Sequence, residues 1–373
     1  MKKIFRYGLK TAAILILAAF SILIAGFLAV RLGWTNVAGE EDNNSDAYNL
    51  ITDIEPIVDK ISSVLPENIS VFGPNEHQNW CRLGAAAAAS PQDAKGIYEA
   101  YSTTKSNELL ERMLLALKLR QGSDSALATA LDNCDNDNRD WDGNRLESLV
   151  KDASGPSAYS WQNSEYWQII KEAILKDKAD IEEASLKAGI QPRLLVSVAI
   201  VEQLRLYYTQ REFYEKFFKP LKILANANKM AWGVMSIKEK MAIETEEHLR
   251  DTESPFYLGQ DKEALLDFPA GSDVAKTRYD RLTNEKDHYY SYLYGALIIK
   301  QFQVQWQKAG YDLQYRPEII ATLFNIGFQN SQPKAEPAVG GSTLEIDGEK
   351  YYFGSLAYEF YYSGELADEF IFE

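Results

Sequence analysis

The chain has 373 residues and a formal net charge of −15 at pH 7, and 46% of its residues are apolar. Five basic residues near the N-terminus contribute to this total, so residues 32–373 alone carry a net charge of −20; the five are Lys2, Lys3, Arg6, Lys10 and Arg31. This acidity excludes nucleic acid as a partner, because a polyanion is bound by a basic surface that releases its counterions. Length and apolar content suffice for a packed core in one or two domains.

Residues 11–30 contain no charged side chain, and they follow a basic head at residues 1–10. A helix of this length spans about 30 Å, and positive charge before it favours a cytoplasmic N-terminus. We therefore predict a single-pass membrane anchor with a cytoplasmic head and the main domain outside, in the periplasm or on the outer face of the cell. A cleaved signal peptide is the alternative, but the run is longer than usual and no small-x-small cleavage site follows Val30.

The rest of the chain is predicted to be mainly α-helical. Residues 31–47 are polar and acidic, which is typical of a flexible stalk. Apolar periodicity predicts helices at 48–64 and 91–119, within a membrane-proximal helical domain at 48–155. Gly155 and Pro156 mark a boundary, and a second domain, 156–373, is expected to begin with one long helix from Ser164 to Gly189. The segment TLEIDGEKYYF predicts a small C-terminal hairpin that turns at Asp347-Gly348.

Two cysteines, Cys81 and Cys134, lie on the side of the membrane where disulfides persist. We predict one intrachain disulfide between them, with two free buried thiols as the alternative.

An acidic segment, NRDWDGNRLE, is a candidate calcium site. Asn138, Asp140 and Asp142 alternate before Gly143, and Glu147 follows, so several oxygens can face one ion as in the first half of an EF-hand. The second half does not match, because Leu149 stands where an EF-hand has its glutamate. A plain turn rich in Asp and Asn is the alternative, and it is favoured.

The segment AGIQPRLLVSVAIVEQLR at 188–205 carries the strongest indication of chemistry. Pro192 suits a first helical turn, and Leu195, Val198, Ala199 and Glu202 fall on one helix face. Removal from water raises the pKa of a glutamate toward the range in which it donates a proton at neutral pH. The alternative is a surface ion pair of Glu202 with Arg205, which would lower that pKa.

Two later segments follow in order, AWGVMSIKEK at 231–240 and PEIIATLFNIGF at 317–328. With the first, they resemble the lysozyme-like superfamily, and specifically the soluble lytic transglycosylases and goose-type lysozymes, as a divergent member. The family pattern is a "G-I-x-P" helix ending in a catalytic glutamate, a "G-L-M-Q" turn and an "A-x-Y-N-x-G" helix. Glu202 matches the glutamate. The turn matches Gly233, Val234, Met235 and Ser236, and the last helix matches Ala321, Phe324, Asn325 and Gly327. The resemblance covers roughly residues 160–330.

Three residues depart from the pattern. Gln203 replaces a serine, Ser236 replaces glutamine and Phe324 replaces tyrosine. The chain between Glu202 and Asn325 is also longer than in compact members, so insertions at about 206–230 and 250–290 are expected to form a lid or a groove wall.

The resemblance implies a lysozyme-like domain that cleaves the β-1,4 bond between N-acetylmuramic acid and N-acetylglucosamine in peptidoglycan. Glu202 would be the general acid and then the base, the substrate's acetamido group would assist, and no cofactor would be required. The residues expected to bind the glycan are Gly233, Met235, Ser236, Phe324 and Asn325. A hydrolytic muramidase is an alternative, for which a further carboxylate would position water; the candidates are Glu244, Glu246, Glu247 and Asp251.

A second alternative is a non-catalytic lysozyme-like module that binds the wall within an envelope protein complex. A glutamate facing a groove would favour the enzyme, and one locked to Arg205 at the surface would favour the scaffold. Metallopeptidase and serine hydrolase functions are excluded, because His77, His248 and His288 lack metal-ligand spacing and no G-x-S-x-G or H-E-x-x-H motif occurs.

The C-terminal 23 residues are rich in aromatic side chains. Such rings can stack on sugars, but at helix and strand spacing they more often fill a core, and the core is the favoured interpretation.

Overall fold

The computed structural model describes residues 76–122, 124–134, 142–217 and 233–372. The predicted head (1–10), anchor (11–30), stalk (31–47) and first helix (48–64) lie outside them. Among the described residues, no helix is both long and apolar enough to span a bilayer. These residues belong to one compact unit. They are mainly helical with a two-stranded sheet near the C-terminus, which confirms the predicted mainly α class.

The described chain before residue 155 is helical. Its elements are α4 (Glu76–Ala89), α5 (Pro91–Thr104), α6 (Asn107–Gln121), α7 (Ala126–Asp132) and α8 (Gly143–Val150). The single helix predicted over 91–119 is wrong, because Lys105 adopts the left-handed conformation, with φ of 53°, and ends α5. The Ser106 hydroxyl then accepts a hydrogen bond from the Leu109 amide and caps the start of α6. A serine cap satisfies an amide that the new helix leaves unpaired.

Cys81 in α4 and Cys134, two residues beyond α7, form a disulfide with their Cα atoms 5.7 Å apart. The prediction of one intrachain bridge is therefore confirmed. Both cysteines are buried, and α4 also packs directly on α5, α7 and α8.

The next elements are α9 (Ser160–Asn163), α10 (Trp167–Lys176), α11 (Lys178–Ala188) and α12 (Pro192–Phe217). The prediction of one helix from Ser164 to Gly189 is wrong at its start, because Ser164 ends α9 and α10 begins at Trp167, and in its middle, where Asp177 separates α10 from α11. The Asp177 carboxylate accepts hydrogen bonds from His288 and Tyr292, which are more than a hundred residues away. This tertiary contact fixes the break, which local periodicity does not reveal. The predicted stop at Gly189 is confirmed, with φ of 79° at the helix end.

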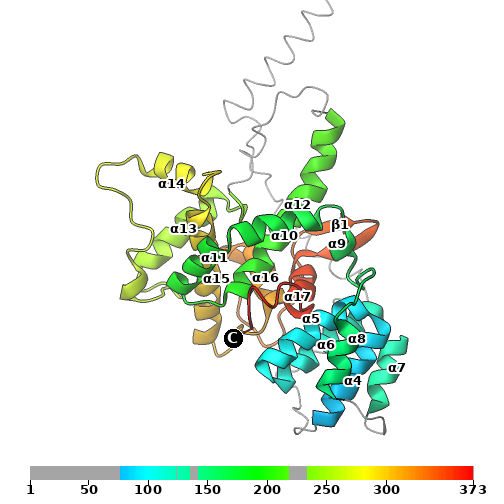
Figure 1. Cartoon of the computed structure of the whole chain (residues 1–373). Coiled ribbons are helices and arrows are strands. Elements are labelled where there is room, and N and C mark those ends of the chain that lie inside the picture. Colours follow the sequence, from blue (N-terminus) through cyan, green and yellow to red (C-terminus); the bar gives the residue numbers. More distant parts are fainter. Residues whose placement is uncertain (1–75, 123, 135–141, 218–232, 373) are drawn as a thin grey trace, which may run out of the picture. The chain divides into compact units, whose positions relative to one another are not determined.

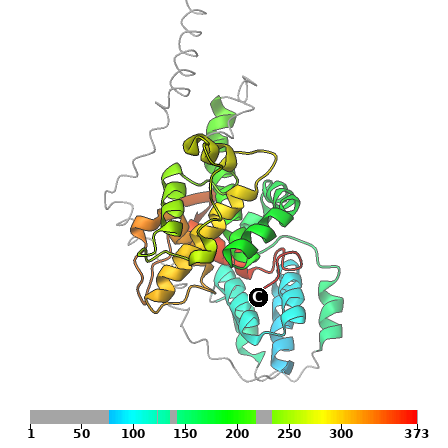
Figure 2. The ribbon, with the colours of Figure 1, turned by 90° about the vertical axis from the view of Figure 1, so that its left-hand side faces the viewer.

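Helix α12 packs against α10, α11, α15, α16, α17 and strand β1. Figures 1 and 2 show its C-terminal end projecting beyond these elements. Every residue from Arg193 to Glu202 is buried. The predicted apolar stripe is therefore part of a segment that is buried on all sides.

The elements after α12 are α13 (Glu239–Arg250), η5 (Gln260–Lys262), α14 (Val274–Leu282), α15 (Tyr289–Lys308), α16 (Pro317–Ile326), η6 (Phe328–Asn330), β1 (Thr343–Ile346), β2 (Glu349–Tyr352) and α17 (Phe353–Tyr362). The hairpin prediction is confirmed, because β1 and β2 pair antiparallel with Ile346 opposite Glu349. Asp347 and Gly348 form the turn with φ of 52° and 85°. Both positive values suit a type I′ turn, which matches the twist of paired strands.

The aromatic tail is largely core. Tyr351, Phe353, Tyr358, Phe360, Tyr361, Tyr362 and Phe370 are all at most 3% exposed. The tail is fastened by Arg193, whose guanidinium donates to the carbonyl oxygens of Phe360, Tyr361, Glu365 and Phe370.

The predicted boundary at Gly155–Pro156 lies between α8 and α9, and contacts cross it. Helix α6 packs on α17. The Arg120 side chain of α6 donates hydrogen bonds to the Ala158 carbonyl, to Ser160 and to Glu349 of β2. It also pairs with Glu359 of α17 at 3.5 Å.

Candidate active site around Glu202

Glu202 lies on α12, where the buried part of the helix ends. Only 3% of the residue is exposed. The Arg205 guanidinium donates to Glu202 Oε2 from Nε at 3.1 Å and from Nη2 at 2.6 Å. The side chain of Arg205 is 27% exposed, so it is the more accessible partner. Glu202 thus combines features of both sequence interpretations: it is paired with Arg205, and it is buried rather than at the surface.

Two opposing effects act on the acidity of Glu202. Burial raises the pKa of its carboxyl group, while the charge and hydrogen bonds of Arg205, the Ser236 hydroxyl and the Lys238 ammonium lower it. Burial is the largest effect, and the pKa lies above the usual value. Ser236 Oγ is buried and makes no hydrogen bond within the described residues, so it lowers the pKa of Glu202 through its proximity alone. A raised pKa is what a general acid requires.

The Gly233–Ser236 turn adjoins Glu202 and is held on two sides. The Gln203 amide nitrogen donates to the Val234 carbonyl at 2.6 Å, and the Met235 amide donates to Ser291 Oγ at 3.3 Å. Gly233 has φ of 73°, and a Cβ there would lie 2.0 Å from the Leu282 carbonyl oxygen. Only glycine therefore fits this position.

Met235 and Phe324 are buried, at 0% and 3% exposure, and both belong to the hydrophobic core. Met235 fills the space against Gly295 of α15. A ligand would reach these two residues through backbone groups or after rearrangement of the core. Sequence alone did not separate their packing role from a binding role.

Asn325 lies near the end of α16, which packs directly on α12. Its Oδ1 accepts hydrogen bonds from the Ser342 amide at 2.8 Å and the Ser342 hydroxyl at 2.9 Å. Asn325 makes no hydrogen bond to Glu202 or to the Gly233–Ser236 turn. Its oxygen thus orders the loop before β1. Within the described part of the chain Nδ2 donates no hydrogen bond, which leaves this donor for a ligand.

The candidate second carboxylates differ in their surroundings. Glu246 is buried, receives two 2.6 Å bonds from Arg278 and a third from Tyr294, and so has little capacity left to position water. Glu244 is half-buried and accepts a hydrogen bond from Gln329 at 3.3 Å. Glu247 and Asp251 are exposed. None of the four bonds to Glu202.

The predicted calcium ligands are partly outside the described residues, where Asn138 and Asp140 lie. Asp142 caps α8 by accepting a hydrogen bond from the Arg145 amide at 2.8 Å, and Glu147 is exposed on that helix. No cluster of three or more metal-ligating side chains occurs among the residues described.

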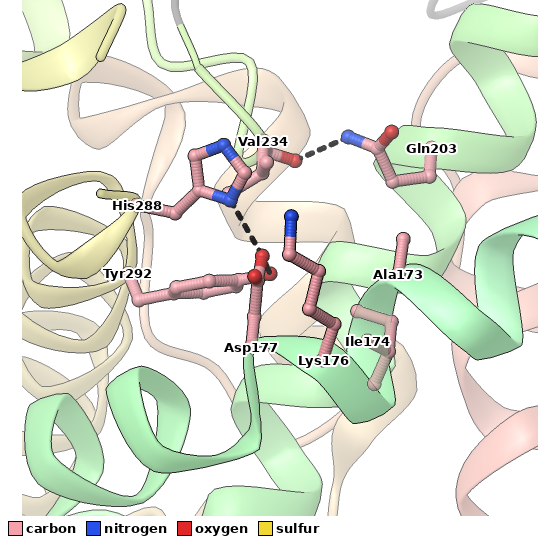
Figure 3. A pocket seen from close by; sticks show the side chains of 8 residues that line it. All are labelled: Ala173, Ile174, Lys176, Asp177, Gln203, Val234, His288 and Tyr292. Atoms are coloured by element: carbon pink, nitrogen blue, oxygen red, sulfur yellow. Dashed lines mark hydrogen bonds and ion pairs between the residues drawn. The ribbon is translucent and has the colours of Figure 1, made fainter. Parts of the chain in front are cut away.

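A cavity borders the Gly233–Ser236 turn at Val234. Figure 3 labels the eight side chains that line it. They come from α10, α12, α15 and the turn itself, together with Asp177 between α10 and α11 and His288 directly before α15. Gln203 and Val234 are among them, and Glu202 is not. Sequence analysis missed this cavity, since its residues are distant in the chain.

Compared with protein-family models, curated proteins and solved structures, the chain matches none.

Proposed function

We propose that the chain is a membrane-anchored peptidoglycan lytic transglycosylase with a divergent lysozyme-like domain, in which Glu202 is the general acid and base. The observation that carries the proposal is the environment of Glu202. This carboxyl group ends the buried segment of the central helix, burial raises its pKa, and it adjoins a glycine turn at the position that the family resemblance assigns.

In the proposed reaction, protonated Glu202 gives its proton to the oxygen between N-acetylmuramic acid and N-acetylglucosamine, and that bond breaks. The acetamido oxygen of the muramic sugar forms a temporary bond to C1. The Glu202 carboxylate then takes the proton of the 6-hydroxyl as this oxygen bonds to C1 and displaces the acetamido oxygen. The product is a 1,6-anhydro sugar, no water is consumed, and Glu202 ends protonated as it began. Asn325 Nδ2 would donate a hydrogen bond to the sugar.

The Glu202–Arg205 pair favours a second candidate, a wall-binding module without catalysis. An ion pair satisfies the carboxylate without any substrate, and a buried pair of this kind is often structural.

The test is digestion of purified peptidoglycan by the full chain in detergent, with products identified by mass spectrometry. Glu202→Gln is the test variant, and Glu359→Gln, which changes another buried glutamate with a raised pKa, is the matched control. We expect anhydro-muropeptides from the parent and the control, and a loss of about 100-fold or more in Glu202→Gln. Products that have gained water would identify a muramidase. No product from the folded parent, with binding to peptidoglycan retained, would identify the wall-binding module.

A further inference from the structure

Figure 3 shows aliphatic and polar side chains around the cavity. Ala173 and Ile174 lie together on one side, whereas Val234 lies between the polar side chains of His288 and Gln203, and Lys176 points toward them. A ligand that fits this lining has a small alkyl group next to a polar or charged one.

Lys176 and His288 supply the positive charge. The Lys176 ammonium points into the space between His288 and Gln203, and it makes no ion pair within the described residues. His288 Nδ1 bonds Asp177 at 2.6 Å, and the other ring nitrogen points away from Asp177. That second nitrogen has no hydrogen bond within the described part of the chain.

The acidic groups nearby are already engaged or lie outside the lining. Asp177 Oδ2 also accepts a hydrogen bond from Tyr292 at 3.0 Å. The hydrogen bond to Asp177 raises the pKa of His288 above its usual value; burial and the Lys176 charge oppose this shift, and Asp180 aids it. When His288 is protonated, the Asp177 carboxylate balances its charge, and Lys176 supplies the net positive charge of the lining. Asp180 does not line the cavity, and its charge acts on His288 in the same direction as Asp177.

Gln203 bounds the cavity beside Val234. Its nitrogen donates to the Val234 carbonyl at 2.6 Å, and its oxygen points away from Lys176 and His288 (Figure 3). Lys176 and the second ring nitrogen of His288 would therefore hold a carboxylate, with a small alkyl group against Ala173 and Ile174.

We propose that this cavity binds the free carboxyl terminus of a short peptide that ends in a small residue such as alanine. The inference rests on the proposed function in one respect: the natural source of such a terminus would be the peptide attached to the glycan. Val234 lines the cavity and Ser236 adjoins Glu202, so one four-residue turn would connect peptide recognition to cleavage.

The test is calorimetric titration of the full chain in detergent with N-acetyl-D-alanyl-D-alanine and with its C-terminal amide. We expect the acid to bind at least ten-fold more tightly than the amide. Lys176→Met should abolish this difference, because Lys176 carries the unpaired charge. Lys187→Met, which changes another exposed lysine outside the lining, should preserve it.

Equal binding of the acid and the amide, or unchanged binding in Lys176→Met, would overturn the proposal. Sodium acetate that binds as tightly as the peptide would reduce the cavity to a simple anion site and overturn the peptide assignment. Displacement of the peptide by a tetramer of N-acetylglucosamine, which has no carboxylate, would instead assign the cavity to the glycan. These titrations measure binding and need no cleavage, and they are repeated in Glu202→Gln. Failure of the transglycosylase proposal would appear in the digestion of peptidoglycan, whereas failure of the present proposal would appear in the titrations.

Discussion

Arg205 donates two hydrogen bonds to a single oxygen of the Glu202 carboxylate, at 3.1 Å and 2.6 Å, although Glu202 itself is only 3% exposed. Burial favours the neutral acid and Arg205 favours the charged form, so the two effects compete at the residue proposed to donate the proton. The position of this balance determines the pH range in which Glu202 can act as an acid.

Replacement of Arg205 by glutamine should raise the pKa of Glu202 further, because burial then acts with less opposition. The protonated acid would persist to higher pH, and the alkaline limb of the pH profile of cleavage should move upward. Arg205→Lys keeps the charge and should leave the limb near its original position. Carbon-13 NMR of the Glu202 carboxyl group gives the same pKa without relying on activity. A limb that stays in place or moves to lower pH in Arg205→Gln would contradict this account.

Gly233→Ala should destabilise the protein far more than Gly271→Ala. Both glycines have similar φ angles, 73° and 77°, but no atom of the described residues lies within 4 Å of a Cβ at Gly271. At Gly233 the added carbon meets the Leu282 carbonyl at 2.0 Å and Ser291 Oγ at 2.5 Å. We expect about 1 kcal/mol from backbone strain alone at Gly271, and about 3 kcal/mol or more at Gly233. Urea unfolding measures the loss of stability in both variants. Equal losses would show that the turn around Gly233 can shift to make room for the added carbon.

Local chemistry explains which features of the fold could be predicted. The Asp347-Gly348 turn and the stop at Gly189 depend on residues that tolerate positive φ, and sequence reveals these directly. The ends of α5 and α10 were missed. The end of α5 is marked by the serine that caps the next helix, but this serine lies within a continuous apolar pattern. The end of α10 is marked by the hydrogen bond between Asp177 and His288, which is 111 residues away in the chain.

The same limit applies to the site. Glu202 could be selected because it follows an apolar helix with a family-like start. The groups that support the site could not be predicted from the sequence, because they come from distant parts of the chain. Ser291 bonds Met235 across 56 residues and Gln203 bonds Val234 across 31, while Ser342 occupies the oxygen of Asn325. Arg193 was overlooked for a similar reason, since its acceptors are more than 160 residues later.

Arg193→Met should cost about 3 kcal/mol or more, because carbonyl groups of four residues around the end of α17 would lose their donor inside the protein. Burial lowers the pKa of Arg193 to about 10, so it remains charged at neutral pH. Urea unfolding gives the loss, and hydrogen exchange should locate it at residues 360–370. Arg250→Met, which removes a half-exposed pair with Asp267, should cost at most about 1 kcal/mol. Similar losses in the two variants would contradict the role given to Arg193.

Glu359 should make the protein less stable as the pH rises from about 4.5 to about 7. Burial raises the pKa of this carboxyl group from 4.5 to about 7, and Arg120 only partly opposes it. In this window the unfolded chain loses a proton that the folded protein retains, so stability falls with pH, by at most about 3 kcal/mol, and is constant above the window. Glu359→Gln should remove this slope and unfold at a higher temperature than the parent at pH 8.

Glu349 provides the matched contrast, because it shares Arg120 with Glu359. Burial pushes the pKa of Glu349 upward, but hydrogen bonds from Arg120 and Ser160 outweigh burial and hold the pKa below its usual value. Its contribution is therefore present above the unfolded-state pKa and is lost as the pH falls through the folded-state value. Glu349→Gln should lower the unfolding temperature at pH 8, where Glu359→Gln raises it. If both variants shifted it in the same direction, Arg120 would not divide its charge between the two carboxylates as the geometry indicates.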